Sequence, residues 1–546
     1  MIRALSMSPS TPIFSPRVLR QRLPRICVAV TGRNAAELMD KAEQVARDNS
    51  FLELRLDYIS QPATLLPKLK GFIGFHPHIA LVATCRRVKS GGRFRGSIAT
   101  QIDLLAKAAS LGCQLVDVEL ETAIHLKQRD WDKLRKAGAS IILSSHDFRA
   151  TRNLEKTYAQ MTRFPADFLK IVSTARELYD NVVMMKFLAA KSDERSLVGV
   201  CMGEQGVISR LLSFRAGSVF TFGASNPGEE TAPGQIAART LRETFRIEQV
   251  DAATRVYGVA GDPVSHSLSP VMMNTAFRRE NLNAVYLAMH AKTMQDLMRC
   301  VRDIPIHGLS VTMPYKESII RHLDKTDSVT QKIGACNTVI RSQDGKLYGF
   351  NTDVAGVIRP LEQRMSIQGS KFLVLGAGGA ARAAVFGLRE RGGEVYVMNR
   401  TAVSGQKLAK QAHAKFLQRA QLARLKFGFD AIINATPVGM DENGANGNGK
   451  KARGEKPLLS EAEMNTRYVF EMVYSPAETS FTRMARNKGI HVIPGVEMFV
   501  HQGARQFEIW TGKPAPVEEM HRVVSHALEQ RAQAAAMAKG KGKGKK

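Results

Sequence analysis

Short apolar runs alternate with amphipathic stretches through the first half of the chain. The stretches Thr100–Leu111 and Leu178–Lys191 carry apolar residues at helical spacing. The runs between such stretches are rich in Val, Ile and Leu, as strands buried on both faces must be. Eight of them occur: Ile26–Val30, Phe51–Asp57, Ile79–Arg86, Leu115–Leu120, Ser140–Asp147, Phe168–Ser173, Leu197–Gly203 and Val219–Gly223. Eight strand–helix units in about 225 residues predict an α/β fold that begins with a (β/α)8 barrel.

The second half shows a different pattern, which starts after a polar connection at residues 246–255. The apolar run Lys371–Leu375 is followed by Gly376-x-Gly378-x-x-Ala381 and an alanine-rich helical stretch. Glycines between a strand and a helix let main-chain N–H groups approach a pyrophosphate. This order predicts a Rossmann dinucleotide-binding domain.

The end of the next predicted strand, Glu394–Met398, indicates which dinucleotide binds. An NAD enzyme would place Asp or Glu near this point to bind the ribose hydroxyls. Here the strand runs into Asn399-Arg400-Thr401. A cation suits the 2′-phosphate, so the sequence predicts NADP as cofactor, with Thr401 and Lys407 assisting; the alternative is a plain surface arginine.

Length and charge exclude several classes of protein. A chain of 546 residues exceeds the size of one hydrophobic core, so we expect two or more domains. The net charge of +28 lies partly at the ends, because six arginines and no acid precede Glu37, and six Lys or Arg and no acid occupy residues 531–546. We therefore expect no specific nucleic-acid partner. No apolar run is long enough for a membrane span, and the six cysteines show no metal-ligand spacing, so no metal is predicted.

Polar residues at the ends of the predicted barrel strands should share one mouth, where such barrels carry their chemistry. Lys170 lies inside the apolar strand that starts at Phe168. A bare buried ammonium is costly, so we interpret Lys170 as a neutral amine that attacks a carbonyl. The alternative is a structural ion pair with Glu53. His146, on the adjacent strand, is a candidate general acid–base; alone it could be a core histidine.

Six motifs follow one another in residues 25–245: Glu53-Leu-Arg55, Thr84-Cys-Arg86, Ser144-Ser-His-Asp147, Lys170, Met202-Gly203 with Ser209-Arg210, and Thr231-Ala-Pro-Gly-Gln235. Together they resemble type I 3-dehydroquinate dehydratase. The resemblance implies that Lys170 forms an imine with the ring ketone and that His146 moves the proton from C2 to the departing hydroxyl. Arg210 would hold the carboxylate, and the other substrate-binding residues would be Glu53, Arg55, Arg86, Thr231 and Gln235.

Two positions depart from that family. It usually has Glu where this chain has Ser90, before Gly91-Gly92, and Ser where this chain has Thr231. Threonine keeps the hydroxyl, so the second change is mild. The first could weaken substrate orientation or closure of the site.

The second half carries a further set of motifs: Ser267-Leu-Ser269-Pro270, Ser310-Val-Thr312-Met-Pro-Tyr-Lys316, Asn337-Thr338, Asn351-Thr-Asp353, Asn434-Ala-Thr436, Glu471-Met-Val-Tyr474 and Gly495 through Gln502. Together they resemble shikimate dehydrogenase. The resemblance implies Lys316 and Asp353 as the catalytic pair, which would donate a proton to the ketone oxygen while hydride arrives; the alternative is a structural salt bridge. Substrate would be bound by Ser267, Ser269, Thr312, Asn337, Thr338 and Gln502.

The same resemblance implies the residues that hold NADP: Gly376, Ala377, Gly378, Gly379, Ala380, Asn399, Arg400, Thr401, Thr436, Met472, Tyr474 and Gly495. Three positions differ from the usual pattern. Met273 stands for His, Ser310 for Asn, and His501 for a small residue. None removes a catalytic group, although the selectivity for ring hydroxyls could change.

We thus expect an N-terminal extension (1–24), a dehydratase barrel (25–247), a shikimate-binding domain (254–365), a Rossmann domain (366–494), helices returning to the substrate domain (495–530) and a basic disordered tail (531–546). Residues 441–456 should form a surface insertion. The expected reactions convert 3-dehydroquinate to 3-dehydroshikimate and then to shikimate. Open alternatives are a preference for quinate, one inactive half acting as a scaffold, and a basic binding protein. The expected location is the cytoplasm, with the plastid as alternative; the oligomeric state is not predicted.

Overall fold

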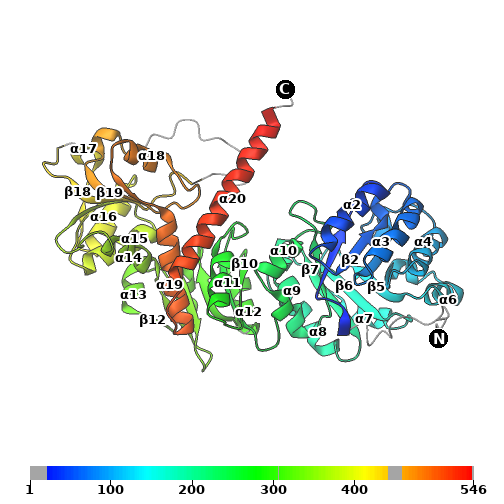
Figure 1. Ribbon diagram of the computed structural model, residues 1–546. Helices are drawn as coiled ribbons and strands as arrows, with labels where there is room; N and C mark the ends of the chain where they lie inside the picture. The colour runs from blue at the N-terminus through cyan, green and yellow to red at the C-terminus, as the bar shows by residue number, and fades with distance from the viewer. Residues whose placement is uncertain (1–20, 305, 423, 441–457, 544–546) are drawn as a thin grey trace, which may run out of the picture. The chain divides into compact units, whose positions relative to one another are not determined.

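The computed structural model describes residues 21–304, 306–422, 424–440 and 458–543 of the chain (Figure 1). The chain divides into two compact units. One comprises Met1–Thr254 with Ala291–Ile304, and the other comprises Arg255–His290 with Pro305–Lys546. Most of the predicted N-terminal extension and the whole predicted insertion at 441–456 lie outside the described residues.

The first unit is the predicted (β/α)8 barrel. Its strands are β1 (Ile26–Val30), β2 (Phe51–Arg55), β3 (Ala80–Thr84), β4 (Leu115–Glu119), β5 (Ser140–His146), β6 (Phe168–Thr174), β7 (Ser196–Met202) and β8 (Thr221–Ala224). They form one sheet in the order β7-β6-β5-β4-β3-β2-β1-β8, and every neighbouring pair is parallel. The main-chain N–H of Val219 donates to the carbonyl of Leu197 at 2.8 Å, which joins the two ends of the sheet.

Helices cover the outside of these strands, as Figure 1 shows. They are α2 (Ala35–Ala46), α3 (Leu66–Phe75), α4 (Ile98–Ser110), α5 (Leu120–Ala123), α6 (Gln128–Lys136), α7 (Leu154–Met161), α8 (Asp180–Lys191), α9 (Val207–Leu212) and α10 (Ala238–Glu243). Helix α12 (Met294–Asp303) also belongs to this unit.

The interior of the barrel is layered. Each strand contributes one residue to an apolar cluster: Cys27, Phe51, Val82, Leu115, Ile142, Phe168, Val198 and Phe222. Because side chains alternate along a strand, the residue two places further on faces the same interior. On β2 to β6 those residues are Glu53, Thr84, Asp117, Ser144 and Lys170, all buried. The strand period therefore places a polar layer, called here the Lys170 cluster, directly on the apolar floor.

The second unit contains two sheets. The first is mixed and consists of β9 (Arg255–Gly261), β10 (Ala284–His290), β11 (Ile306–Val311), β12 (Lys325–Thr326), β13 (Thr338–Arg341) and β14 (Leu347–Phe350), in the order β10-β9-β11-β13-β14-β12. Its associated helices are α11 (Ser269–Arg279), α13 (Ser328–Ile333), α14 (Asp353–Glu362), α19 (Gly495–Thr511) and α20 (Val517–Lys543).

The second sheet is parallel throughout and confirms the predicted Rossmann fold. Its strands are β15 (Lys371–Leu375), β16 (Glu394–Met398), β17 (Lys415–Phe416), β18 (Phe429–Asn434), β19 (Thr466–Glu471) and β20 (His491–Ile493). Their order in the sheet is β17-β16-β15-β18-β19-β20. From β15, the chain adds strands first toward one edge of the sheet and then, from β18, toward the other edge, and ligands bind at such a switch point. The helices of this sheet are α15 (Gly379–Glu390), α16 (Ala402–Gln411), α17 (Arg419–Leu422) and α18 (Ser480–Asn487).

Helix α14, which begins at Asp353, is packed between two other helices at glycine positions. A methyl group on Gly356 would lie 2.9 Å from the carbonyl oxygen of Met498 on α19. On α15, a methyl group on Gly387 would lie 2.9 Å from the side chain of Val354. Both distances are shorter than ordinary carbon contacts, so the glycines set how closely α14 approaches α19 and α15.

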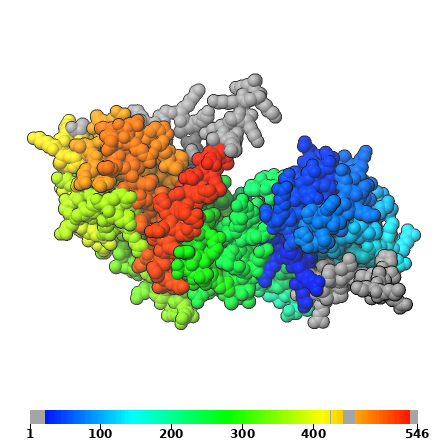
Figure 2. Space-filling model, viewed as in Figure 1, coloured from blue at the N-terminus to red at the C-terminus, as the bar shows by residue number. Residues whose placement is uncertain are grey.

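Helix α20 packs along α11, and Figure 2 shows the red surface of α20 against the green surface of the chain that contains α11. Met520, Val524 and Leu528 share one apolar cluster with Phe277. The helix continues through residues 531–543, where a disordered tail was predicted, because the alanine-rich run after Arg531 favours a helix. Residues 544–546 lie outside the described part of the chain. Arg531 donates a hydrogen bond to the carbonyl of His266 at 2.9 Å.

Candidate active sites

The barrel site centres on Lys170, which lies on β6 and is 3% exposed. Its Nζ lies 3.0 Å from Asp117 Oδ2 and 3.9 Å from Glu53 Oε1, and it stands 3.8 Å from the centre of the Phe222 ring. The ion pair that the sequence suggested, with Glu53, is thus the longer of two. Lysine and carboxylates stabilise each other inside an otherwise apolar barrel.

Asp117 is the hub of the charges around Lys170. Besides the lysine, it accepts hydrogen bonds from Arg86 at 2.9 Å and from the Ser144 hydroxyl at 2.6 Å. Burial alone would raise the pKa of Asp117, but the charges of Lys170 and Arg86 hold it well below its ordinary value. Asp117 therefore stays ionised and fixes the position of both cations.

His146 ends β5 and faces the same group of charges. Burial, with the positive charges of Arg86 and Lys170, holds the pKa of His146 well below its usual value. Its Nδ1 is buried and has no hydrogen-bond partner among the described residues. The ring lies parallel to Phe148, with centroids 6.0 Å apart. A neutral imidazole next to a lysine has the form that a general base requires.

The other predicted substrate ligands of the barrel surround this centre in three pairs. Arg55 forms two hydrogen bonds to Asp57, at 2.9 and 2.8 Å. Glu53 accepts from the Thr84 hydroxyl at 2.8 Å. Gln235 Oε1 accepts from the main chain and the hydroxyl of Thr231 at 2.7 and 3.1 Å.

Arg210 is a buried cation that no carboxylate neutralises in the contacts that it makes. It donates to the carbonyl of Pro233 at 3.2 Å, and its Nε has no partner among the described residues. Burial lowers the pKa of Arg210 to about 10. A buried guanidinium with an unfilled donor is suited to an incoming carboxylate.

Ser90, which departs from the family pattern, is buried and donates to Glu121 at 3.1 Å. The glycines that follow it permit close contacts: a methyl group on Gly91 would lie 2.3 Å from the Phe148 ring, and one on Gly92 would lie 2.0 Å from the carbonyl oxygen of Arg86. The loop thus packs on residues next to His146 and on Arg86 itself.

The second site contains the predicted pair Lys316 and Asp353. Lys316 Nζ lies 2.6 Å from Asp353 Oδ2, and Asn337 Nδ2 donates to the other carboxylate oxygen at 2.8 Å. The Lys316 side chain is 23% exposed and that of Asp353 is 5% exposed. Asn337 is itself fixed, because its Oδ1 accepts hydrogen bonds from the Thr338 hydroxyl and from Thr352. The pair can donate a proton toward solvent-accessible space.

The remaining predicted substrate ligands come from three segments of the second unit. Ser267 and Ser269 lie next to each other, and the main chain of Ser269 donates to the Ser267 hydroxyl at 3.2 Å. The main chain of Thr312 donates to Ala260 at 2.9 Å, which holds it at the end of β9. Gln502 donates to the Phe499 carbonyl at 3.0 Å, and its Cβ lies 3.0 Å from where a methyl group on Gly356 would be.

The glycine turn after β15 has the shape that a dinucleotide requires. Gly376 has a φ of +117°, a conformation that favours glycine. Nothing lies within 4 Å of the position that a Cβ on Gly378 or Gly379 would take, among the described residues. Together with Ala377 and Ala380, this turn leaves room for phosphates at the N-terminus of α15.

The other predicted cofactor residues follow neighbouring strands of the same sheet. Arg400 and Thr401 are exposed after β16, and Asn399 Nδ2 donates to the Thr401 carbonyl at 2.9 Å. The Thr436 hydroxyl, after β18, donates to Asn434 at 2.7 Å. After β19, Met472 donates to the Asn434 carbonyl at 3.1 Å, and a methyl group on Gly495 would lie 2.8 Å from the Tyr474 nitrogen. These residues fit an NADP site with a cation for the 2′-phosphate.

Sequence reasoning gave no role to Asp117 or Glu471. Asp117 is a charged residue within an apolar strand, which is the signal that identified Lys170. Glu471, at the end of β19, accepts from Asn434, the Val473 main chain and the Thr479 hydroxyl at 2.7, 3.0 and 2.8 Å. Burial raises the pKa of Glu471 to about 7.

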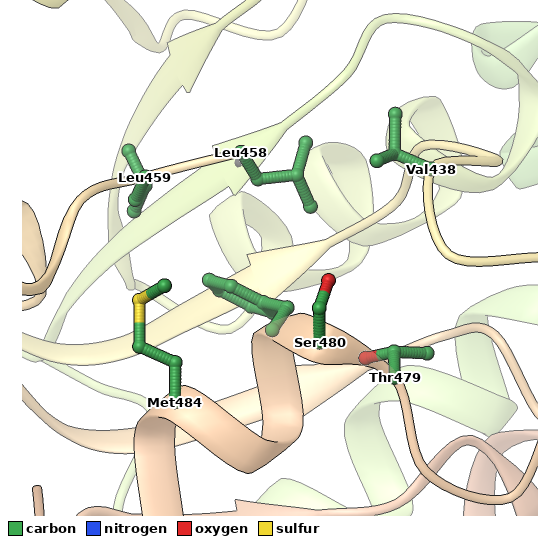
Figure 3. A pocket seen from close by; sticks show the side chains of 7 residues that line it. Val438, Leu458, Leu459, Thr479, Ser480 and Met484 are labelled. Carbon is green, nitrogen blue, oxygen red and sulfur yellow. The ribbon is translucent and has the colours of Figure 1, made fainter. Parts of the chain in front are cut away.

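One small apolar depression lies next to Glu471, because Thr479, which donates to Glu471, forms part of its lining (Figure 3). It is lined by Val438, Leu458, Leu459, Thr479, Ser480, Phe481 and Met484, none of which is a predicted site residue. Within the described ranges, no cluster of His, Cys, Asp and Glu is arranged to hold a metal ion. In the same ranges, no helix combines the length and the apolar character needed to cross a membrane.

The two units therefore define a two-enzyme chain, a lysine-centred barrel lyase joined to a Rossmann-type oxidoreductase. Family profiles match both parts: type I 3-dehydroquinase matches residues 26–252, the shikimate dehydrogenase substrate binding domain 259–339, shikimate/quinate 5-dehydrogenase 360–440, and the shikimate 5′-dehydrogenase C-terminal domain 495–524. The chain belongs to the family of bifunctional 3-dehydroquinate dehydratase/shikimate dehydrogenases.

Several individual proteins are similar to this chain. The chloroplastic bifunctional 3-dehydroquinate dehydratase/shikimate dehydrogenase of Arabidopsis thaliana is 32% identical over 523 residues, which cover 92% of this chain and 84% of the relative. The NADP(+) shikimate dehydrogenase of Pyrococcus furiosus is 37% identical over 283 residues, 52% of this chain and 99% of the relative. The crystal structure of shikimate dehydrogenase from Aquifex aeolicus covers 50% of this chain and 99% of its own at 32% identity, with a TM-score of 0.45.

Proposed function

We propose that the barrel dehydrates 3-dehydroquinate to 3-dehydroshikimate and that the second unit reduces this product to shikimate with NADPH. The observation that carries the proposal is that each unit of this family member contains its own lysine–aspartate centre. Lys170 lies 3.0 Å from Asp117 in the barrel, and Lys316 lies 2.6 Å from Asp353 in the second unit.

In the barrel, the Lys170 ammonium first gives up a proton to neutral His146, which passes it to solvent, and the free amine adds to the ring ketone. The adduct then loses water to form an imine. The imine draws electrons from the neighbouring C2–H bond, so a base can remove that proton. Neutral His146 takes the proton and returns it to the hydroxyl that leaves as water. Hydrolysis of the imine then frees Lys170, and Arg210 holds the substrate carboxylate throughout.

In the second unit, bound NADPH supplies the hydride that reduces the ketone carbon. The chain's own part is to place the substrate and to deliver a proton. Ser267 and Ser269 bind the carboxylate, and Asn337, Thr338 and Gln502 bind ring hydroxyls. The Lys316 ammonium, oriented by Asp353, donates the proton to the ketone oxygen and stabilises its developing charge.

A coupled assay tests both steps. When wild-type protein is given 3-dehydroquinate and NADPH, the NADPH absorbance should fall. Lys170→Ala and Lys316→Ala should each prevent this fall. Added 3-dehydroshikimate should restore consumption in Lys170→Ala alone. If the wild type reacts with 3-dehydroshikimate but not with 3-dehydroquinate, the barrel is inactive, and the loop at Ser90 is the first place to examine.

Quinate is a second candidate substrate for the dehydrogenase, because the matching profile over residues 360–440 is named for shikimate and quinate. Oxidation rates with the two compounds at equal concentration decide between them. A higher rate with quinate than with shikimate would make quinate the preferred substrate.

We also infer a cytoplasmic location, with the plastid as alternative. The acid-free start of the chain suits either, and the Arabidopsis relative is named chloroplastic. A fluorescent fusion that carries the whole chain would show which compartment holds it.

A further inference from the structure

A row of buried polar side chains runs beneath the second site. It starts at Tyr286 on β10, whose phenol donates to the Ser310 hydroxyl at 2.6 Å. Ser310 donates to Gln506 Oε1 at 2.7 Å, and Gln506 Nε2 donates to the Thr338 hydroxyl at 3.1 Å. These four side chains, called here the buried relay, are each less than 7% exposed. They link β10, β11, α19 and β13, which are far apart in sequence.

Both ends of the relay reach predicted site residues. At one end, Thr338 donates to Asn337 at 2.8 Å, and Asn337 donates to Asp353, the partner of Lys316. At the other end, the Ser269 side chain lies near the phenol of Tyr286. From Tyr286 onward the hydrogen bonds run in one direction, and they end at the carboxylate of the proposed catalytic pair.

Further hydrogen bonds hold the relay residues in place. Asn274 on α11 holds the main chain of Tyr286 through two hydrogen bonds of 2.8 Å, one to its nitrogen and one to its carbonyl. Gln506 makes a further bond to the Asn337 carbonyl at 3.2 Å. Each member uses its hydroxyl or amide groups on the next, so the loss of one leaves a buried polar group unpaired.

We propose that Tyr286 and Gln506 are positioning residues for the reduction, which fix the distance and orientation between the carboxylate-binding serines and the Lys316–Asp353 pair. This inference rests on the proposed reductase function. Ser310 is essential to it, because its small hydroxyl both accepts from Tyr286 and donates to Gln506. The relay thus uses the residue that departs from the usual family pattern.

The test compares Tyr286→Phe, Gln506→Met and the double variant in the full-length protein. Each single change should lower kcat/KM for 3-dehydroshikimate by about tenfold, because misplaced ligands slow the reaction. The double variant should lose about as much as either single change, since both break one chain of bonds. KM for NADPH and the rate of dehydration of 3-dehydroquinate should stay unchanged.

Trp510→Phe is the matched control. Trp510 lies on the same helix as Gln506, and its Nε1 donates to the carbonyl of Val339, the residue after Thr338, at 2.9 Å. Its loss removes a buried hydrogen bond to the same strand but none of the hydrogen bonds of the relay, and phenylalanine keeps an aromatic ring near Tyr286. The control should lower the melting temperature without changing kcat/KM.

Two outcomes overturn the inference. One is that Tyr286→Phe and Gln506→Met lose stability and keep kcat/KM, as the control does. The other is that their effects multiply in the double variant to about a hundredfold, which would mean independent sites. A wild type that fails to reduce 3-dehydroshikimate would instead refute the proposed function. In every variant, the dehydration rate reports whether the barrel unit is folded, and the melting temperature of the second unit reports whether that unit is folded.

Discussion

The two lysine–aspartate pairs differ in how their surroundings treat charge. Lys170 and Asp117 are almost completely buried and share their charges with Arg86 and Glu53. Lys316 is partly exposed, and its partner Asp353 is held by a neutral amide, that of Asn337. In the proposed mechanism, the same two residue types thus serve a covalent nucleophile in one place and a proton donor in the other. The surroundings, rather than the pair, decide the chemistry.

Removal of Asp117 should have the largest effect. In Asp117→Asn, Lys170 and Arg86 would keep buried charges without their main counter-charge, so the first unit should lose about 3–5 kcal/mol of stability as well as its activity. Urea unfolding followed by the dehydratase assay measures both. Asp103→Asn, which breaks an exposed pair with Lys133, should cost less than about 1 kcal/mol. Equal losses in the two variants would contradict the comparison.

Asp353→Asn should lower activity strongly while it changes stability little. The variant keeps a buried hydrogen-bonding group of the same size, so the melting temperature should change little. Reduction of 3-dehydroshikimate should slow on the order of 10³-fold, because the proton donor loses its orientation. The dehydratase rate of the same protein is the internal control; if it falls equally, the variant is misfolded and the pair has no special role.

Glu471 extends the comparison to a buried carboxylate that has only neutral donors. Its pKa is raised from 4.5 to about 7. Between these values the unfolded chain binds fewer protons than the folded one, so stability should fall as pH rises, by about 3 kcal/mol in total. Chemical unfolding of the second unit from pH 4.5 to 7.5 should show this slope in the wild type, and Glu471→Gln should remove it.

Glu478→Gln is the control for that slope. Glu478 is an exposed acid of the same region, paired with Arg483 and Arg486. Substitution of Glu478 should not change the fall in stability between pH 4.5 and 7. A wild-type curve that is flat in this window would show that Glu471 ionises normally.

Arg400 tests an exposed cation that forms no ion pair with the residues that the structure describes. Arg400→Ala should raise KM for NADPH by about tenfold, the equivalent of one charge-assisted hydrogen bond, and should leave KM for NADH unchanged. Steady-state kinetics with both nucleotides measures this. Arg391→Ala, which breaks an exposed pair with Glu362, serves as the control. An equal rise for NADH would assign Arg400 to general folding of the site.

The smallest effect is expected at Arg531, whose hydrogen bond to His266 holds the loop before Ser267. Arg531→Gln should raise KM for 3-dehydroshikimate about threefold and leave kcat unchanged, since a largely exposed contact contributes less than about 1 kcal/mol. Arg522→Gln, on the same helix and paired with Glu519, should change neither constant. An unchanged KM in Arg531→Gln would remove any role for α20 in substrate binding.

Much of the fold could be predicted because the strands are short, apolar and regularly spaced. Predicted strands such as Ile26–Val30 and Lys371–Leu375 match β1 and β15 at both ends. Motif residues that lie at strand ends, such as His146 and Arg400, could be assigned because position along a parallel strand fixes which edge a side chain reaches.

The residues that sequence reasoning missed lie where several segments meet. Asp117 is placed beside Lys170 by the barrel closing around it, and Gln506 meets Ser310 across 196 residues of sequence. The periodicity of residues within one segment does not indicate such long-range contacts. The same limit applies to α12, whose residues follow β10 in sequence but belong to the barrel unit.

Gly356 on α14 and Gly387 on α15 lie where α14 meets its neighbouring helices, and they have a consequence for the proposed reduction. Asp353 begins α14, Gln502 lies on the helix packed against Gly356, and the phosphate-binding turn begins α15, which meets α14 through Gly387. The absence of a side chain at these two positions therefore sets the separation between the proposed proton donor and the proposed nucleotide-binding turn. Hydride transfer tolerates errors of only a fraction of an ångström. The two glycines thus help to set the geometry of the proposed reaction, although neither is a predicted site residue.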